Sequence, residues 1–542
     1  MTSHEHASPA TNHNSRYIYR DTTLADQAKA LADSLGEAVA IRFDNGDELS
    51  YREAWHHGLT LAAALQHAGL NPGETLSFQL PNGRESVIIA IAASICGLVI
   101  NPIVPIYRGR ELNFILDDAA TKVLFIPGHY RNFNYPEMID GLRDDLPALK
   151  HVICVRATDP LPNGFHHFED FMGSSTPDRA TVAPVNPNDL KILLYTSGTT
   201  GNPKAVRHSH NTLTAALDNG MSGWCLSADD VMLMPSPVTH ITGYVNGIEL
   251  PFFSATQTLL MEAWDVDKAI DLIENQGATT CVSATPFLQE LVATCKAQGK
   301  SLPGFRLFAC GGASVPPALI YEASKVLSSC RAVRVYGSTE TPLVTIGFPE
   351  PENESWAAET DGRIHNYEVC VCDDDGVNLG LNTEGEIYVR GPAMMLGYAN
   401  ADQNTAAFSA DGFFMTGDIG KILASGAVVI TDRKKDIIIR GGENLSAREI
   451  EEVILQHPDV IEVAVVAAPH SRLGEGVAAF VVPRPTKTLC LDDLLSLMAS
   501  LQVAKQKWPQ YMESVDALPK TASGKVQKEI LRRELKTSGV LL

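Results

Sequence analysis

Small hydroxyl residues and glycines surround a single lysine in the stretch LLYTSGTTGNPKAV, from Leu193 to Val206. Backbone N–H groups in such a turn form a concave anion site, hydroxyl groups add donors, and Lys204 adds a positive charge. The loop follows a strand-like run and leads toward a predicted helix over 211–220, whose N-terminus would also favour phosphate. It is not a P-loop, because Pro203 precedes the lysine, and it is not a GxGxxG dinucleotide motif. By itself the stretch predicts an anion-binding loop or, equally well, an ordinary surface turn.

Three other short motifs hold residues suited to nucleotide chemistry. YGSTET (336–341) places Glu340 among hydroxyls after a strand, and Mg²⁺ prefers one or two carboxylates together with phosphate oxygens. TGDIG places Asp418 in a tight turn, where a carboxylate can accept hydrogen bonds from both hydroxyls of a ribose. PKTASGKVQK places Lys525 in a loop that contains glycine. Taken singly, each residue is explained as well by a solvated turn.

A pair of histidines suggests a different kind of site. His208 and His210 are two residues apart, so on a strand both could face one metal ion. No third ligand lies nearby in the sequence, and zinc sites use three or four protein ligands. We therefore interpret the pair as a polar lead-in to the following helix.

Charge and cysteine content exclude several classes of protein. The chain has 43 basic and 64 acidic residues, a net charge of -21, and a surface this acidic repels phosphate backbones. We therefore expect no nucleic-acid partner. The ten cysteines show no CxxC pair and no zinc spacing, which favours a reducing, cytoplasmic location.

Neither apolar nor terminal segments indicate a membrane protein. The leader MTSHEHASPATNHNSR is polar and lacks the apolar core of a signal peptide. The apolar run that starts at Val87 ends at Asn101, short of the roughly 20 residues that a span needs. We expect no membrane span here, but a buried helix that Gly97 separates from a short strand.

The order of strand-like and helical runs predicts the fold class. Between about residues 189 and 340, apolar strands alternate with helical patterns, one of which ends at Gly277 as at a C-cap. Such alternation predicts an α/β fold with parallel strands covered on both faces, and the segment before residue 185 suggests a second sheet layered with it. After Asp361, short strands with glycine turns predict a small β-barrel-like unit. The final part predicts a compact α+β domain whose first helix is capped by Ser446, with Glu449 at capping-box spacing.

In this order the motifs resemble those of the adenylate-forming superfamily, which contains acyl-CoA synthetases, peptide-synthetase adenylation domains and luciferases. The resemblance rests on YTSGTTGNPKAV, PVTHITG, CGGAS, YGSTET, TGDIG, DRKKDIIIRGGENLSAREIE and PKTASGKVQK, and extends from about residue 25 to Glu534. It implies a disordered leader over 1–24, an N-terminal adenylation domain over 25–433 and a small mobile C-terminal domain over 434–542. It also implies a two-step reaction, in which a carboxylic acid and ATP form an acyl-adenylate with loss of pyrophosphate, and a thiol then displaces AMP.

The resemblance assigns roles in binding ATP. Thr196 and Glu340 would lie near Mg²⁺, and Tyr336 would stack on the adenine. Asp418 and Arg433 would hold the ribose hydroxyls. The residues expected to contact the nucleotide are Thr196, Ser197, Gly198, Thr199, Thr200, Gly201, Lys204, Gly311, Gly312, Ala313, Tyr336, Gly337, Ser338, Thr339, Asp418, Arg433 and Lys525.

The resemblance also assigns the catalytic and thiol-binding roles. Lys525 would bridge the substrate carboxylate and the α-phosphate, and with His240, Glu340 and Thr196 it makes up the expected catalytic set. Because this lysine would block the incoming thiol, the C-terminal domain would rotate about a hinge at Lys435. The segment then facing the site and expected to bind CoA is Gly441, Gly442, Glu443 and Asn444.

The segment PVTHITGYVNGIELP bears on the choice of acid. Relatives that activate amino acids place an aspartate there, whereas this chain offers Thr239, His240 and Thr242, which disfavours an α-amino acid. Gly243 and Gly247 would leave one helix face without side chains, either to admit a ring or chain or to permit close helix packing. The residues expected around the acyl group are His240, Ile241, Gly243, Tyr244, Gly312, Pro342 and Leu343.

This segment is most similar to that of bacterial ligases for cyclohexanecarboxylate and similar alicyclic or medium-chain acids. A benzoate-like aromatic acid remains an alternative. About 17 residues follow Lys525, too few for a fused carrier domain, so free CoA is the expected thiol. A ligase that loads a separate carrier protein, a luciferase-like oxidase and a non-catalytic nucleotide-binding protein are the competing hypotheses. The sequence leaves open whether the chain forms a homodimer.

Overall fold

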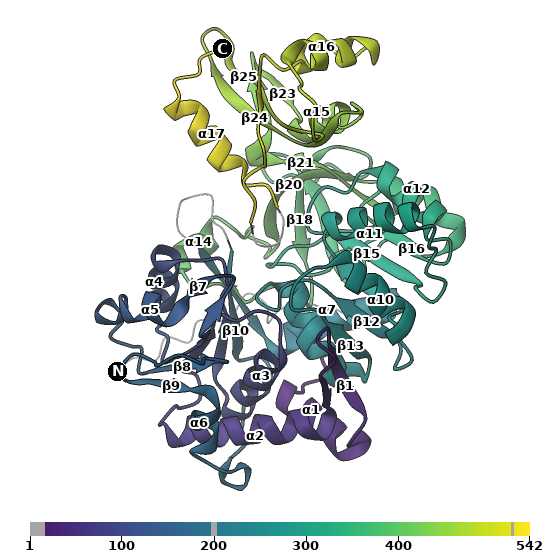
Figure 1. The fold of residues 1–542 in the computed structure, drawn as a ribbon. Coiled ribbons are helices and arrows are strands. Elements are labelled where there is room, and N and C mark those ends of the chain that lie inside the picture. Colours follow the sequence, from purple (N-terminus) through teal and green to yellow (C-terminus); the bar gives the residue numbers. More distant parts are fainter. Residues whose placement is uncertain (1–16, 197–202, 522–524) are drawn as a thin grey trace.

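A computed structural model describes residues 17–196, 203–521 and 525–542. Figure 1 shows two large α/β lobes below and a small C-terminal unit above them, with short antiparallel strands between. The architecture agrees with the α/β class that the sequence predicts.

Seven strands form the first sheet, and every neighbouring pair is parallel except the pair that includes the edge strand β2. The strands between the edges are buried, as expected when helices cover both faces of a parallel sheet. In spatial order they are β16 (Arg331–Val335), β15 (Leu307–Gly311), β14 (Thr280–Ser283), β12 (Val231–Met234), β13 (Gln257–Leu260), β1 (Val39–Phe43) and β2 (Glu48–Ser50).

Eight strands form the second sheet, which is parallel except at one end. There the strand that follows the predicted anion-binding loop runs antiparallel to both of its neighbours. In spatial order the strands are β19 (Gly397–Tyr398), β11 (Lys204–Ser209), β10 (Leu190–Thr196), β4 (Val99–Pro102), β3 (Thr75–Phe78), β5 (Val123–Pro127), β8 (His151–Val155) and β9 (Phe165–His167).

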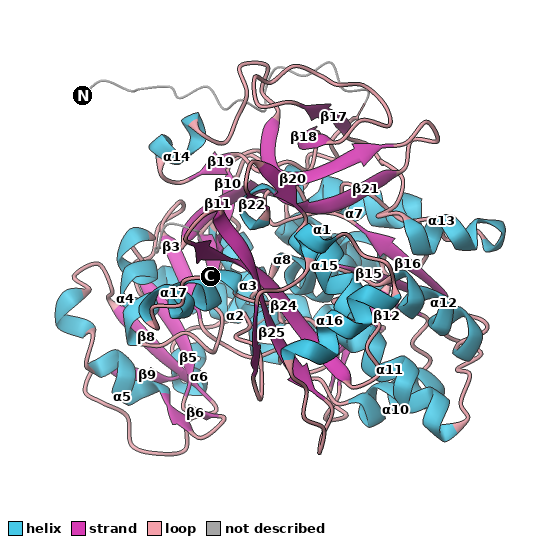
Figure 2. Ribbon diagram, turned by 90° about the horizontal axis from the view of Figure 1, so that it is seen from above, coloured by secondary structure: helices cyan, strands magenta, loops and turns pink. Residues whose placement is uncertain are grey.

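Helices pack against both sheets. The apolar run after residue 87 forms a helix that ends at Gly97, whose φ of 68° is left-handed, and a strand follows as predicted. The helices of this part are α1 (Leu24–Leu35), α2 (Tyr51–His67), α3 (Arg84–Cys96), α4 (Gly109–Asp118), α5 (Tyr135–Asp140), α6 (Phe168–Gly173), α7 (His210–Gly223), α8 (Ile241–Gly243), α9 (Leu250–Ser254), α10 (Val266–Gln276), α11 (Thr285–Gln298), α12 (Pro317–Val326), α13 (Glu354–Glu359) and α14 (Ala401–Thr405). Figure 2 shows α10, α11 and α12 beside strands β12, β15 and β16 of the first sheet.

Four antiparallel strands form the small β unit that the sequence predicts after Asp361. Among the residues described, no helix combines the length and hydropathy needed to cross a bilayer. A hairpin of β6 (His129–Tyr130) and β7 (Phe133–Asn134) lies apart from the larger sheets. The four strands of the unit are β17 (Glu368–Cys372), β18 (Gly385–Arg390), β20 (Phe414–Ile422) and β21 (Val428–Arg433).

Residues from Ile438 onward form an α+β unit with its own hydrophobic clusters. As predicted, Ser446 caps the first helix, because its side chain accepts from the Glu449 N–H at 3.1 Å. The Glu449 carboxylate pairs with Lys507 instead of accepting from the Ser446 N–H, so the predicted capping box is only half formed. The elements are β22 (Ile438–Arg440), β23 (Glu443–Leu445), α15 (Ala447–Ile454), β24 (Val460–His470), β25 (Gly474–Pro483), α16 (Leu491–Ser500), β26 (Tyr511–Ser514) and α17 (Lys528–Thr537).

Part of the expected disordered leader needs correction. Tyr17 donates a hydrogen bond to Asp218 at 2.5 Å, and Arg20 forms an ion pair with the same carboxylate at 2.7 Å. Thr23 caps α1. Residues 17–24 are therefore packed onto the N-terminal domain, and residues 1–16 lie outside the described part.

Candidate active site

The predicted anion-binding loop joins two antiparallel strands. Thr196 at the end of β10 is paired in register with Lys204 at the start of β11. The loop therefore leads into a strand before helix α7 begins at His210, so no helix N-terminus follows it directly. The predicted phosphate-binding residues Ser197, Gly198, Thr199, Thr200 and Gly201 lie outside the described residues.

A tyrosine that sequence reasoning missed joins Lys204 to Glu340. The Lys204 Nζ lies 4.9 Å from the centroid of the Tyr398 ring. The Tyr398 hydroxyl donates to Glu340 Oε1 at 2.9 Å, and burial followed by the Glu340 charge raises the pKa of that hydroxyl. One carboxylate beside a lysine and a phosphate loop fits a Mg²⁺ ion that takes its other ligands from phosphate oxygens and water. Thr196 and Glu340 are the residues that would hold it.

Glu340→Gln is expected to raise the KM for MgATP at least tenfold, because the neutral amide no longer attracts the metal. The measurement is pyrophosphate release at varied free Mg²⁺. Glu359→Gln is the matched control, since Glu359 also accepts a tyrosine hydroxyl, that of Tyr321, but on the surface. An unchanged Mg²⁺ dependence in Glu340→Gln would remove Glu340 from the metal site.

Asp418 holds a second polar cluster together. One carboxylate oxygen accepts from the Tyr336 hydroxyl at 2.7 Å, and the other forms an ion pair with Arg433 Nε at 2.9 Å. Asp418 and Arg433 are direct partners on β20 and β21, and the Asp418 charge raises the pKa of Arg433. The predicted ribose-binding residues therefore lie together, with the half-buried Tyr336 bonded to Asp418.

Glycines at the ends of two parallel strands allow close backbone packing beside this cluster. A Cβ on Gly311 would lie 2.6 Å from the Val335 carbonyl oxygen, and one on Gly337 would lie 2.6 Å from the Leu343 nitrogen. Gly312 has a φ of 78°, which favours glycine. The carboxyl ends of parallel strands are where α/β sheets bind ligands, and a surface without side chains suits a planar base. Ala313, the fourth predicted residue here, is exposed.

Lys525 reaches this region from the C-terminal unit. Its backbone exchanges hydrogen bonds with Thr521, and its Cε lies 3.8 Å from the position of a Cβ on Gly312. Burial and the nearby Arg433 lower its pKa, whereas Glu340 and Asp418 oppose that shift. A lysine among these groups can meet a carboxylate and a phosphate at the same time.

His240 lies close enough to Lys525 for the lysine charge to act on its imidazole. Its Nδ1 accepts from the Thr242 N–H at 3.4 Å at the start of α8. Burial, followed by the Lys525 charge, lowers the pKa of its imidazole to about 3, so the ring is neutral at neutral pH.

A cavity of about 110 Å³ lies between these residues. Many of the predicted site residues line it. Several other lining residues could not be predicted from the sequence, because they come from separate strands and helices. The lining residues are Ala216, Trp224, Ser236, Pro237, His240, Ile241, Thr242, Val245, Asn246, Val282, Ser283, Ala284, Phe287, Gly311, Gly312, Val335, Tyr336, Gly337, Ser338, Thr339, Pro342, Leu343 and Lys525.

Two predicted acyl-pocket residues, Gly243 and Tyr244, are not in this lining. They belong to a helical segment over 241–249, here called the cavity helix, which runs from α8 into the π-helical turn Tyr244–Glu249. A Cβ on Gly243 would lie 2.0 Å from the Pro237 carbonyl oxygen, and one on Gly247 3.1 Å from Met234. Both glycines therefore permit close packing, which was the alternative explanation. Tyr244 turns away from the cavity toward Lys191.

The two histidines first considered for a metal have structural roles. His208 Nε2 lies 2.7 Å from the Thr339 carbonyl oxygen, and Nδ1 lies 3.0 Å from the Thr212 hydroxyl. Burial lowers the pKa of His208 to about 4. His210 begins α7 and accepts from the Leu24 N–H at 3.2 Å. Within the described ranges, no group of three or more His, Cys, Asp or Glu side chains is arranged for a metal.

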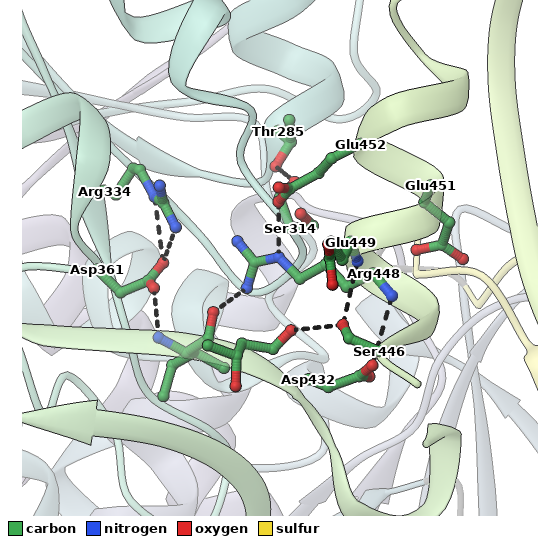
Figure 3. Close-up of polar contacts among 12 residues, drawn as sticks. Thr285, Ser314, Arg334, Asp361, Asp432, Ser446, Arg448, Glu449, Glu451 and Glu452 are labelled. Carbon is green, nitrogen blue, oxygen red and sulfur yellow. Dashed lines mark hydrogen bonds and ion pairs between the residues drawn. The ribbon is translucent and has the colours of Figure 1, made fainter. Parts of the chain in front are cut away.

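The C-terminal unit is held against β21 by its first helix (Figure 3). Arg448 Nη1 donates to the Ile430 carbonyl at 2.7 Å, and the Ser446 hydroxyl donates to the Thr431 carbonyl at 3.2 Å. From the other side, the Ile430 N–H donates to Asp361 at 2.8 Å, and Asp361 is paired with Arg334. These contacts hold the arrangement in which Lys525 lines the cavity.

Arg448→Met is expected to slow adenylate formation about tenfold, because fewer contacts then hold Lys525 in place. Thioester formation from preformed acyl-AMP should not fall. The two half-reactions are measured separately, with Arg484→Met as control, since Arg484 bonds to the Pro458 carbonyl within its own unit. Wild-type adenylation in Arg448→Met would contradict this role.

The predicted CoA residues lie on the C-terminal unit, and the predicted hinge lies just before it. Lys435 lies in the turn Lys434–Asp436 between β21 and β22. Gly441 and Gly442 have φ values of 62° and 91° and form the turn before β23. This turn and the adjoining Glu443 and Asn444 are exposed and do not line the cavity.

Comparison with known proteins identifies the family. The model of the AMP-binding enzyme family matches residues 28–399, and that of the AMP-binding enzyme C-terminal domain matches residues 449–525. The chain is 32% identical to the medium-chain fatty-acid–CoA ligase of Escherichia coli (strain K12), over 96% of this chain and 91% of that protein. It is 33% identical to the indoleacetate–CoA ligase of Aromatoleum aromaticum, over 91% of this chain and 94% of that protein.

A solved structure agrees with these sequence relatives. ATP-bound MatB from Rhodopseudomonas palustris superposes with a TM-score of 0.83 and 29% identity, covering 95% of this chain and 99% of that chain. The chain therefore belongs to the AMP-binding enzyme family and is an acyl- or aryl-CoA ligase that works through an acyl-adenylate, with ATP, Mg²⁺ and CoA.

Proposed function

We propose that the enzyme activates a compact, apolar carboxylic acid, either alicyclic, such as cyclohexanecarboxylate, or medium-chain. The observation that carries this proposal is the small cavity beside His240 and Lys525. Its walls include Ile241, Val245 and Phe287, and none of the described residues that line it is Asp or Glu. Its volume of about 110 Å³ limits the acid to a small group; for scale, an apolar cavity of about 150 Å³ binds benzene, so a ring requires its walls to move slightly.

An amino acid is disfavoured by the same geometry. Glu249 is an acidic residue in the segment where amino-acid-activating relatives carry an aspartate, and it is not in the cavity lining. It forms a buried ion pair with Lys191 instead. A substrate ammonium group in the cavity would therefore lack a carboxylate partner.

The roles proposed for single residues follow from their positions. Lys525 offsets the charge of the substrate carboxylate and of the α-phosphate, and neutral His240 orients the carboxylate. Lys204 and the loop before it bind the β- and γ-phosphates, while Asp418 and Arg433 bind the ribose. After adenylate formation, the C-terminal domain rotates about Lys435 and brings the CoA-binding residues Gly441, Gly442, Glu443 and Asn444 to the site.

The test is pyrophosphate release over a panel of acids, followed by mass detection of the acyl-CoA product. Hexanoate, octanoate and cyclohexanecarboxylate should give the highest kcat/KM, and glycine and malonate should give little. Preference for long-chain acids would contradict the compact-acid proposal. Thioester on a carrier protein, with little acyl-CoA, would contradict the choice of CoA.

An aromatic acid is the second candidate. Trp224 and Phe287 both line the cavity and offer flat faces to a ring. One relative, the indoleacetate–CoA ligase, is named for an aromatic acid. Benzoate and indoleacetate therefore belong in the panel, and a kcat/KM above that of cyclohexanecarboxylate would favour this candidate.

A further inference from the structure

A buried ion pair joins the phosphate-loop strand to the cavity helix. Lys191 on β10 donates from Nζ to Oε1 of Glu249, the last residue of the cavity helix. Their side chains are only 4% and 1% exposed. Neither residue lines the cavity, so the proposed mechanism leaves the pair without a role.

The residues around the pair do not supply a second charge to either Lys191 or Glu249 in the described structure. Lys191 Nζ lies 6.0 Å from the centroid of the Tyr244 ring. The Tyr244 hydroxyl is buried without a hydrogen-bond partner in the described structure. His210 is close enough for Lys191 to affect it, but burial keeps its imidazole neutral. Glu249 therefore takes its counter-charge from Lys191.

The cavity helix has two functional faces. Ile241, Thr242, Val245 and Asn246 line the cavity, whereas Glu249 is bonded to β10. Because these faces share one short helix, any rotation about its axis moves both.

The position of Glu249 depends on the π-helical turn Tyr244–Glu249. A π turn holds one more residue than α-helical hydrogen bonding does, and such turns are common at functional sites. Conversion of residues 244–249 to an α-helix would rotate Glu249 away from Lys191 and leave two buried charges without partners. Buried polar pairs are best known for fixing register in this way, rather than for adding stability.

We infer that Lys191 and Glu249 form a positioning pair, which fixes the register of the cavity helix and thereby the shape of the acid site. This inference rests on the proposed function of the cavity as the acid site.

The test compares KM for cyclohexanecarboxylate with KM for ATP in full-length variants. Glu249→Gln removes the counter-charge, and the double variant Lys191→Met with Glu249→Met replaces the pair with apolar side chains of similar length, which commonly preserves folding. Both should raise the KM for the acid about tenfold or more, as a small misplacement of binding residues does. The KM for ATP should stay within about twofold.

Lys296→Met is the control, because Lys296 forms an exposed pair with Glu322 at 2.6 Å. A double variant that folds and keeps the wild-type KM for the acid would overturn the inference, as would equal rises in both KM values. If wild-type enzyme released pyrophosphate with none of the acids, the proposed function itself would fail. The two failures are therefore distinct.

Discussion

Lys525→Ala is expected to slow acyl-adenylate formation by a factor of about 10²–10³, the usual effect of removing one preorganised electrostatic group. The reason is its position among Gly312, Arg433, Glu340 and Asp418, where its ammonium group can offset the repulsion between a carboxylate and the α-phosphate. Thioester formation from preformed acyl-AMP should change less than about threefold, because that step no longer joins two anions. Pyrophosphate release measures the first step, and acyl-CoA formation from synthetic acyl-AMP measures the second.

Lys520→Ala provides the matched control for this experiment. Lys520 lies in the same loop, paired across it with Val526, but its Nζ binds Glu462 at 2.7 Å. Both half-reactions should keep their wild-type rates in this variant. If Lys525→Ala slowed the two half-reactions equally, the lysine would act in thiol transfer or in general stability rather than in adenylation.

Residues inside motifs could be predicted from the sequence. Glu340, Asp418, Arg433 and Lys525 lie within short segments whose composition is unusual, and the structure brings all four near one cavity. Helix ends were predicted for a similar reason, since Gly277, with a φ of 75°, stops α10 through a local preference of the backbone.

Residues that act through distant partners could not be predicted in this way. Tyr398 bonds to a carboxylate 58 positions earlier, and His208 lies against a carbonyl 131 positions later. Such contacts depend on strand order, which no local pattern records. Lys191 is a single charged residue in an apolar strand. Lysine is rarely buried without a partner, and this was the only feature of the sequence that pointed to a special role for it.

The strand after the phosphate loop is another such case. Residues 204–209 form β11 because β10 and β19 lie on either side of it. Strand pairing of this kind fixes register through partners that are remote in the sequence. The loop therefore leads into a strand, so the expected contribution from the dipole of a following helix is not available there.

Two cavities that share Trp224 as a wall indicate what limits the size of the acid. Trp224 lines the acid cavity and also a second cavity of about 530 Å³, whose other walls include Arg306, Ile346 and His365. Its indole is 2% exposed and donates from Nε1 to the Ile346 carbonyl at 2.8 Å, which fixes its orientation. The tryptophan thus stands between the two spaces.

Trp224→Ala is expected to join these spaces and to change the choice of acid. The ratio of kcat/KM for dodecanoate to that for cyclohexanecarboxylate should rise about a hundredfold, because the chain gains room while the ring loses a wall. Truncation of a buried tryptophan costs about 3–5 kcal/mol of stability, so thermal unfolding must be measured alongside. Trp224→Leu, which leaves a smaller cavity, should give an intermediate ratio.

The control separates lost packing from lost specificity. Trp264 donates to Glu290 and packs edge-on against the ring of Phe287, and it is not among the lining residues of either cavity. Trp264→Ala should lower stability without changing the preference between the two acids. If both tryptophan variants lost activity toward both acids in proportion, Trp224 would serve only the core. A selective gain for dodecanoate in Trp224→Ala would instead make this one side chain the limit on acid length, because the rest of the chain is the same in both reactions.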